Sequence, residues 1–250
     1  MSDPQDVPPW LERYRRDGIT SLPFVLMQRE LDRLKLACES LLGRGNGFAK
    51  LENAADRSDA FYESLVRTDL LDCLSMILDG SVVLEHTKVH RGSPPGPWHR
   101  DLASYPMTTT DLVTVAIWLD DVDARHGGLA YIPASHRLGS SSLRACAQTP
   151  VDNPREPSNL SAAAGSVTAH HGQLLHRPLA CKAYAPRFVL LGVYRSAMAR
   201  PITQRGSSRY AGLLLVGHEP TTFAADPEAI LGAGLGTRDL WFRGQRCGMM

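Results

Sequence analysis

The spacing of apolar residues divides the chain into a helical first part and a β-rich second part. Apolar positions recur close to the helical period in two stretches, Gln28 to Leu42 and Phe61 to Asp79. Each stretch is followed directly by a glycine, Gly43 or Gly80, which is typical of a helix end. The pattern therefore predicts two helices within residues 1–80, and we expect this part to form a helical buttress.

After residue 80 the sequence changes to short β-branched and apolar runs separated by glycine and proline. The predicted strands are Val82–Val89, Leu112–Leu119, Leu129–Ile132, Ser166–His170, Phe188–Tyr194 and Ala211–Val216. No helical pattern recurs between them, which disfavours a parallel sheet with crossover helices. The order favours an antiparallel sandwich or barrel.

One long segment interrupts the strands. Residues 139–165 are rich in Ser, Pro and Ala and show little periodicity. Loops of that length are uncommon unless they are functional lids or disordered. We therefore expect a lid-like insertion there.

Composition excludes several classes of partner. The 250 residues contain 27 Lys and Arg against 26 Asp and Glu, so no basic excess exists for nucleic acid or for an anionic membrane surface. Five cysteines are irregularly spaced without a CxxC motif, which argues against a disulfide framework and a thiolate zinc site. The first residues lack the apolar core of a signal peptide. We expect a cytoplasmic protein with neither nucleic acid nor membrane as partner, and the sequence predicts no oligomeric state.

The string Trp98-His99-Arg100-Asp101 is the strongest local candidate for chemistry. In an extended segment, residues two apart point to the same side, so His99 and Asp101 could present an imidazole and a carboxylate to one metal ion. A third ligand from His170, His171 or His176 would complete two histidines and one carboxylate on one face of an octahedron. Non-haem Fe(II) oxygenases bind iron in this way. Alternatively, His99 and Asp101 are an ordinary pair of surface residues that bind no metal. The surrounding motifs decide between these two interpretations.

Four motifs follow one another in a specific order. They are RRDGITSLPFVL, WHRDLASYP, DLVTVAIWLDDVDARHGGLAYIPASHR and AGSVTAHHGQLLHRPLACKAYAPRFVLLGVY. From about Tyr14 to Tyr194 the chain thereby resembles the phytanoyl-CoA dioxygenase family of Fe(II)- and 2-oxoglutarate-dependent oxygenases. The resemblance implies a mainly β fold with flanking helices around a double-stranded β-helix, or jelly-roll, core. The implied single domain, 1–250, comprises the buttress 1–80, the core 81–217 with its insertion 139–165, and a tail 218–250.

The resemblance also assigns individual residues. His99, Asp101 and His176 match the iron ligands, so the distal ligand is implied to be His176. Arg187 lies eleven residues after His176, where the family has the arginine that pairs with the far carboxylate of 2-oxoglutarate.

Two further groups of residues take weaker roles from the resemblance. Additional cosubstrate contacts are implied for Lys50, Lys88 and Ile117. Substrate neighbours are implied for Trp98, Tyr105 and Arg177. The family's HGS after the distal histidine is replaced by His176-Arg177-Pro178, so no substrate identity can be transferred from a relative.

The activity implied by the resemblance is the oxidation of an unactivated C–H bond in a small organic molecule, with Fe(II), 2-oxoglutarate and O2 as cofactor and cosubstrates. Succinate and CO2 would be released. Hydroxylation is the default outcome, but desaturation, cyclisation, epimerisation or rearrangement start from the same radical. Tailoring of a secondary metabolite is the expected setting.

Three alternatives remain at this level. The substrate could be an acyl thioester of CoA or a carrier protein. The chain could also be a non-catalytic metal- or ligand-binding member of the same fold, although such a protein has no need to retain the three ligands and Arg187 together. A hydrolytic zinc site is disfavoured because no glutamate is suitably placed as general base near His99 or His176.

Overall fold

The computed structural model of the chain describes residues 7–45, 47–138, 156–181, 187–203 and 208–218. Most of the insertion expected at 139–165, and all but the first residue of the tail 218–250, lie outside these ranges. Within the described residues, no helix is both long and apolar enough to cross a membrane.

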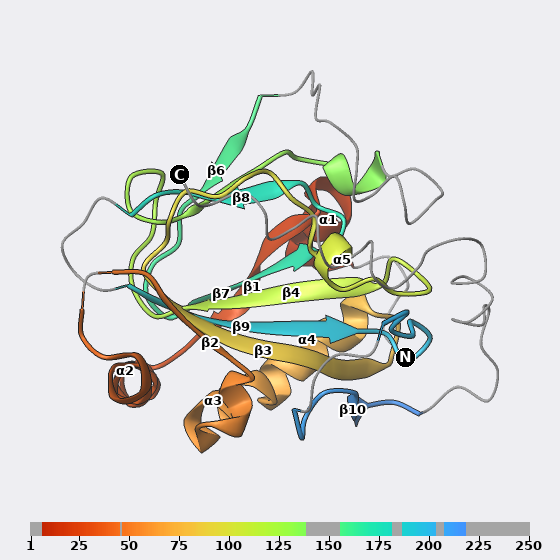
Figure 1. Ribbon diagram of the computed structural model, residues 1–250. Coiled ribbons are helices and arrows are strands. Elements are labelled where there is room, and N and C mark those ends of the chain that lie inside the picture. The colour runs from red at the N-terminus through yellow and green to blue at the C-terminus, as the bar shows by residue number, and fades with distance from the viewer. Residues whose placement is uncertain (1–6, 46, 139–155, 182–186, 204–207, 219–250) are drawn as a thin grey trace.

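Two antiparallel sheets form the centre of the molecule (Figure 1). The strands of the larger sheet are β1 (Ile19–Val25), β2 (Ala49–Glu52), β3 (Val82–Arg91), β4 (Leu112–Trp118), β7 (Ser166–His171), β9 (Phe188–Arg195) and β10 (Leu213–Val216). Their order is β1-β7-β4-β9-β3-β10, with β2 paired to β3. The smaller sheet has the order β6-β5-β8 and consists of β5 (Leu129–Tyr131), β6 (Ser158–Leu160) and β8 (His176–Pro178).

Helices cover the outer face of the larger sheet (Figure 1). The helices on this face are α2 (Gln28–Leu42), α3 (Asp59–Leu65) and α4 (Thr68–Ile77), whereas α1 (Pro9–Asp17) and α5 (Asp101–Ser104) lie on the other side of the sheet. Two short 3-10 turns are η1 (Ala54–Asp56) and η2 (Ser135–Arg137). Buried side chains of α2, α3 and α4, such as Leu34, Phe61 and Leu74, form one apolar core with strand residues such as Ile117 and Leu190. The inner face of the larger sheet is therefore left to face the smaller sheet.

All six predicted strands are present, but the first 80 residues are not purely helical. Strand β1 pairs antiparallel with β7 at the edge of the larger sheet, and β2 pairs with β3. The pairing of β1 shifts register between Ser21 and Val25, around Pro23. A proline cannot donate to a ladder, so it is confined to edge strands and bulges, and its presence hid this strand from the sequence pattern.

The single helix expected from Phe61 to Asp79 is wrong, because the structure divides it into α3 and α4. Tyr194, fully buried in β9, donates a hydrogen bond of 2.7 Å to the carbonyl oxygen of Leu65, the last residue of α3. Arg67 then takes an extended backbone and pairs with Asp69 at 2.6 Å. A tertiary contact thus takes a carbonyl that a continuous helix would have used itself.

Candidate functional site

The two predicted histidine ligands are joined by their backbones. His99 and His176 form an isolated antiparallel bridge, in which each residue's N–H donates to the other's carbonyl at 2.9 and 3.0 Å. Their rings consequently lie side by side, with centroids 4.3 Å apart. Asp101 follows as the first residue of α5, so the chain turns between His99 and Asp101 rather than continuing as a strand. The backbone is extended at His99 and Arg100 and becomes helical at Asp101, so the two residues lie at the exit of an extended segment and both side chains reach the same point.

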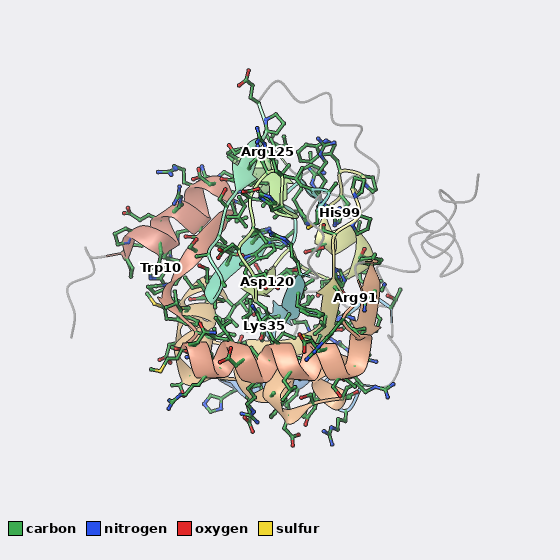
Figure 2. All side chains as sticks on the ribbon, turned by 90° about the vertical axis from the view of Figure 1, so that its left-hand side faces the viewer. Trp10, Lys35, Arg91, His99, Asp120 and Arg125 are labelled. Atoms are coloured by element: carbon green, nitrogen blue, oxygen red, sulfur yellow. The ribbon has the colours of Figure 1, made fainter. Side chains whose placement is uncertain are left out.

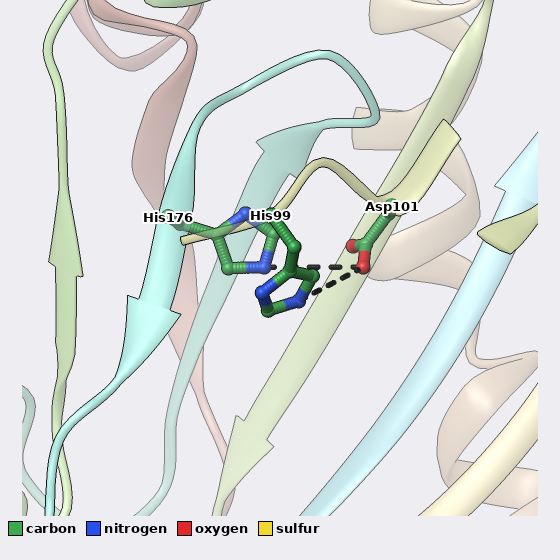
Figure 3. A group of neighbouring side chains, drawn as sticks. All are labelled: His99, Asp101 and His176. Carbon is green, nitrogen blue, oxygen red and sulfur yellow. Dashed lines mark ion pairs between the residues drawn. The ribbon is translucent and has the colours of Figure 1, made fainter. Parts of the chain in front are cut away.

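Three donor atoms converge where these residues meet (Figure 3). The Nε2 atoms of His99 and His176 each lie 3.8 Å from Oδ1 of Asp101. All three donor atoms lie within 4.8 Å of one another. Among the described residues this is the only group of three or more His, Cys, Asp or Glu side chains so arranged. The spacing suits a single metal ion held on one face.

Hydrogen bonds fix which nitrogen of each imidazole faces the site. Nδ1 of His99 donates to the carbonyl of Pro97 at 3.1 Å, and Nδ1 of His176 donates to the carbonyl of Leu174 at 2.9 Å. Because a carbonyl only accepts, Nδ1 of each ring is a protonated nitrogen. The Nε2 lone pairs are therefore directed at the metal position, as metal-binding histidines require.

The carboxylate of Asp101 is held in the same manner by one of its two oxygens. Oδ2 accepts a hydrogen bond of 2.6 Å from the hydroxyl of Thr114 and one of 2.9 Å from Nε2 of His170. Thr114 on β4 and His170 on β7 are direct partners across the sheet. Oδ1 is left for a metal. His170, one of three candidates for the third ligand, instead orients Asp101, and no sequence pattern pointed to Thr114.

Burial and charge set the protonation states that a divalent cation needs. Burial lowers the pKa of His176 to about 3, so its imidazole is neutral at pH 7. Burial alone would raise the pKa of Asp101, but the effects of His176, His170 and Lys88 outweigh it and hold that pKa well below its usual range. The site therefore offers neutral imidazole nitrogen and one carboxylate oxygen, a donor set that fits Fe(II).

The three donors open into a cavity of about 190 Å³ between the two sheets. Its walls are mainly apolar, with Leu129 from the smaller sheet and Leu191 from the larger one among them. Two cationic side chains, Lys88 and Arg187, also line it. Asp101 is the only acidic residue among the described lining residues.

Arg187 enters this cavity immediately before β9. Its guanidinium donates to the backbone carbonyls of Asp121 and His126. Within the described part of the chain, no carboxylate lies within ion-pair distance of it. A positive charge oriented by neutral carbonyls and facing a cavity is suited to an anion that enters from outside.

Asp120 links the start of β9 to helix α2. Figure 2 shows Lys35 on α2 beneath Asp120, and the two side chains form an ion pair of 2.8 Å. The second oxygen of Asp120 accepts a hydrogen bond of 2.8 Å from the backbone N–H of Phe188. The residue after Arg187 is thereby held in place by α2.

Of the further cosubstrate residues, the structure brings only Lys88 to the cavity. Lys50 lies outside the lining and forms an ion pair of 2.6 Å with Glu52. The expectation for Ile117 is wrong, because its side chain belongs to the outer core beneath the helices. Its neighbours Ala116 and Trp118 face the cavity instead. Side chains alternate along β4, so an error of one residue exchanges the two faces.

The three expected substrate neighbours do not line the cavity either. The guanidinium of Arg177 lies over the ring of Trp98, 4.9 Å from its centroid. Tyr105 is buried at 3% exposure, and the ammonium of Lys88 lies 5.7 Å from its ring centroid. Each of these side chains therefore supports a neighbour of the site rather than the cavity surface.

Known proteins resemble this chain in sequence. A model of the phytanoyl-CoA dioxygenase (PhyH) family matches residues 14–188. A probable alpha-ketoglutarate-dependent hypophosphite dioxygenase of Stutzerimonas stutzeri is 30% identical over 190 residues, covering 70% of this chain and 66% of that protein. An L-proline trans-4-hydroxylase of Streptomyces griseoviridis is 31% identical over 146 residues, 51% of this chain and 54% of the relative. The chain thus spans between about half and two thirds of the length of these curated relatives.

Solved structures resemble it in fold. The non-heme alpha ketoglutarate dependent epimerase SnoN from nogalamycin biosynthesis superposes with a TM-score of 0.69 at 22% identity, covering 77% of this chain and 84% of that one. EctD from S. alaskensis with bound Fe gives a TM-score of 0.67 at 17% identity, with 80% of each chain covered. These likenesses confirm the expected jelly-roll core. Because the family model matches well over half of its length, the chain belongs to the phytanoyl-CoA dioxygenase family.

Proposed function

We propose that this protein is a non-haem Fe(II)- and 2-oxoglutarate-dependent dioxygenase that oxidises a C–H bond of a small molecule, with hydroxylation as its default outcome. The observation that supports this most directly is the set of three converging donors. The remaining polar atoms of His99, Asp101 and His176 are all engaged in hydrogen bonds, and the three free donor atoms face one cavity.

In this proposal, His99, Asp101 and His176 would hold Fe(II) where their donor atoms converge at the cavity. Bound iron, with 2-oxoglutarate and O2, supplies the oxidising chemistry. Arg187 pairs with the distal carboxylate of 2-oxoglutarate and so orients the cosubstrate along the cavity. The apolar walls, including Leu191 and Trp118, exclude water and place the target bond close to the site.

The cavity argues against hydrolysis by the same triad. A zinc hydrolase needs a general base beside the metal-bound water. Asp101 is the only acid among the described lining residues, and both of its oxygens have other roles. No protein base is required for an oxygenase, because the cofactor and the cosubstrate perform the chemistry.

Further observations support one domain, a cytoplasmic location and small molecules as partners. The main apolar core includes Tyr14 near one end of the described chain and Leu190 near the other, which supports one domain. Three described cysteines, Cys38, Cys73 and Cys181, are free thiols, which supports a reducing cytoplasm. The near-neutral charge supports small molecules, rather than nucleic acid or membranes, as partners. The two curated relatives are named for hypophosphite and L-proline, which are both small.

The test is anaerobic addition of Fe(II) and then 2-oxoglutarate, with the visible charge-transfer band of the chelate as readout. We expect the band in the wild type and its loss in His99→Ala and His176→Ala. Truncating a buried charge-paired contact costs about 2–5 kcal/mol, so Arg187→Met should weaken 2-oxoglutarate at least tenfold.

The matched control is Arg125→Met, an exposed arginine of the loop whose carbonyls Arg187 contacts, labelled in Figure 2. This variant should keep wild-type affinity for 2-oxoglutarate. Folded, iron-loaded protein that never develops the band would instead support a non-catalytic metal-binding protein. The thioester alternative makes a different prediction. The band would appear, no small molecule would stimulate succinate formation, and a CoA or carrier-protein thioester would stimulate it.

A further inference from the structure

We propose that the substrate carries one anionic group, a carboxylate or a phosphorus oxyanion, and that Lys88 and His90 on β3 bind this group. The inference rests on the proposed function, since it concerns the second ligand of the same cavity. It assigns Lys88 to the substrate rather than to 2-oxoglutarate.

The register of the larger sheet places both residues on its inner face. Lys88 is opposite Leu191 of β9, which is opposite Ala116 of β4. His90 is opposite Val189, in the next row of inward-facing residues. All five side chains line the cavity. Lys88 and His90 therefore face the cavity from β3. Apolar side chains of β9 and β4 lie between them and the metal-binding residues.

The ammonium of Lys88 forms no ion pair in the described part of the chain, although its charge is close enough to Asp101 to help lower the pKa of that carboxyl. Its ammonium contacts the ring of Tyr105, and no carboxylate lies within ion-pair distance. Lys50 on the adjacent strand, by contrast, is paired with Glu52 at 2.6 Å. A buried or half-buried ammonium without a counterion is costly, so a lysine retained in such a cavity is suited to an incoming anion.

The charges of the loaded cavity lead to the same conclusion. The two positive charges of Fe(II) and the one of Arg187 balance the carboxylate of Asp101 and the two carboxylates of 2-oxoglutarate. Lys88 then remains as one uncompensated positive charge, and a substrate with one anionic group neutralises it.

His90 supplies a second polar contact of the right kind. Its Nε2 is buried and has no hydrogen-bond partner, while the ring is covered edge-on by Phe48, with centroids 5.6 Å apart. Burial lowers the pKa of His90 to about 4, so at pH 7 the ring is neutral and can donate one N–H. A buried polar atom without a partner in a ligand cavity is expected to be satisfied by the ligand.

The cavity limits the size of the substrate. Its volume of about 190 Å³ must hold 2-oxoglutarate as well as the part of the substrate that reaches the metal side. A compact anion fits this space, and a long acyl chain would have to extend out of it.

The experiment is anaerobic calorimetry on protein loaded with Fe(II) and 2-oxoglutarate. The probes are hypophosphite and two pairs in which an amide replaces the carboxylate, propionate with propionamide and L-proline with L-prolinamide. We expect at least one anion to bind, and at least one carboxylate to bind tenfold or more tightly than its amide. Lys88→Met should weaken the anion at least tenfold and leave 2-oxoglutarate within twofold, whereas Lys88→Arg should retain most of the anion affinity.

Two further variants make the test specific. His90→Phe should weaken the anion about threefold to tenfold, because one neutral hydrogen bond is lost. Lys50→Met removes a lysine of the neighbouring strand that is already paired, and it should change neither affinity.

The outcomes separate this inference from the function on which it rests. Failure to bind Fe(II) and 2-oxoglutarate would overturn the proposed function. Normal binding of both, with neither carboxylate bound more tightly than its amide, would overturn the inference alone. A loss of 2-oxoglutarate rather than anion affinity in Lys88→Met would also overturn it and would make Lys88 a cosubstrate contact.

Discussion

Replacing Thr114 by valine should impair metal binding without disturbing the fold. The hydroxyl of Thr114 is buried and donates the 2.6 Å hydrogen bond that holds Oδ2 of Asp101. Valine has nearly the same shape, so the packing between β4 and β7 is kept. Asp101 then retains only His170 as a hydrogen-bond donor, and the orientation of Oδ1 toward the metal position is less fixed.

The size of the effect follows from this one hydrogen bond. A hydrogen bond to a charged group contributes about 1.5–3 kcal/mol, and a factor of ten in affinity corresponds to about 1.4 kcal/mol. The metal affinity of Thr114→Val should therefore fall about 10- to 150-fold. This range agrees with the 10- to 100-fold losses that are typical when a residue supporting a metal ligand is removed.

The assay is calorimetric titration with Mn(II) under conditions in which thermal unfolding shows both proteins folded. Thr114→Ser keeps the hydroxyl and should bind Mn(II) nearly as the wild type does. Thr168→Val is the matched control, since Thr168 lies in the next inward-facing row and its hydroxyl accepts from Trp118 at 3.0 Å instead of contacting Asp101. Equal metal affinity in Thr114→Val and wild type, or an equal loss in Thr168→Val, would refute the reasoning.

Three other outcomes are expected. Tyr194→Phe leaves the carbonyl of Leu65 unpaired and should lower the free energy of unfolding by about 1–3 kcal/mol in urea, whereas Tyr62→Phe, whose ring only stacks on a neighbour, should change it little. Mn(II) at 100 times its dissociation constant should raise the free energy of unfolding by about 2.7 kcal/mol in the wild type, and an equal rise in His176→Ala would exclude this residue as a ligand. Burial lowers the pKa of His171 to about 4, so the unfolded chain takes up its proton first. His171 should therefore contribute up to about 3 kcal/mol to the stability that the metal-free protein loses as the pH falls from 6.5 to 4, beside the losses from His90 and His176. His171→Gln should make this dependence shallower between pH 6.5 and 4 without abolishing it, and an unchanged slope would contradict the assignment.

The parts of the fold that the sequence predicted well are those with enough residues to carry a pattern. Strands β3, β4 and β9 are seven to ten residues long and rich in Val, Leu and Ile. Strands β6 (Ser158–Leu160) and β8 (His176–Pro178) have three residues each and lack the apolar run by which the equally short β5 was recognised. The short β8 nevertheless contains His176, so the motif identified a ligand whose strand the hydrophobic pattern did not reveal.

The metal ligands were predictable because they lie in motifs whose order is specific. The groups that orient them were not, since each depends on pairing between distant parts of the chain. Thr114 meets Asp101 only through the turn between residues 101 and 112, and His170 does so through the register of β7 against β4. Such contacts between strands have no local signal in one sequence.

The error at Ile117 has the same origin and indicates how the inner face of β4 can be identified. Every residue of β4 is buried, because helices cover one face and the smaller sheet faces the other. A strand buried on both sides has no polar alternation, so its sequence leaves open which residues face the cavity. Thr114 resolves this, since its hydroxyl binds Asp101 and must point inward. Counting in steps of two from Thr114 gives Ala116 and Trp118, and it excludes Ile117 from the inner face.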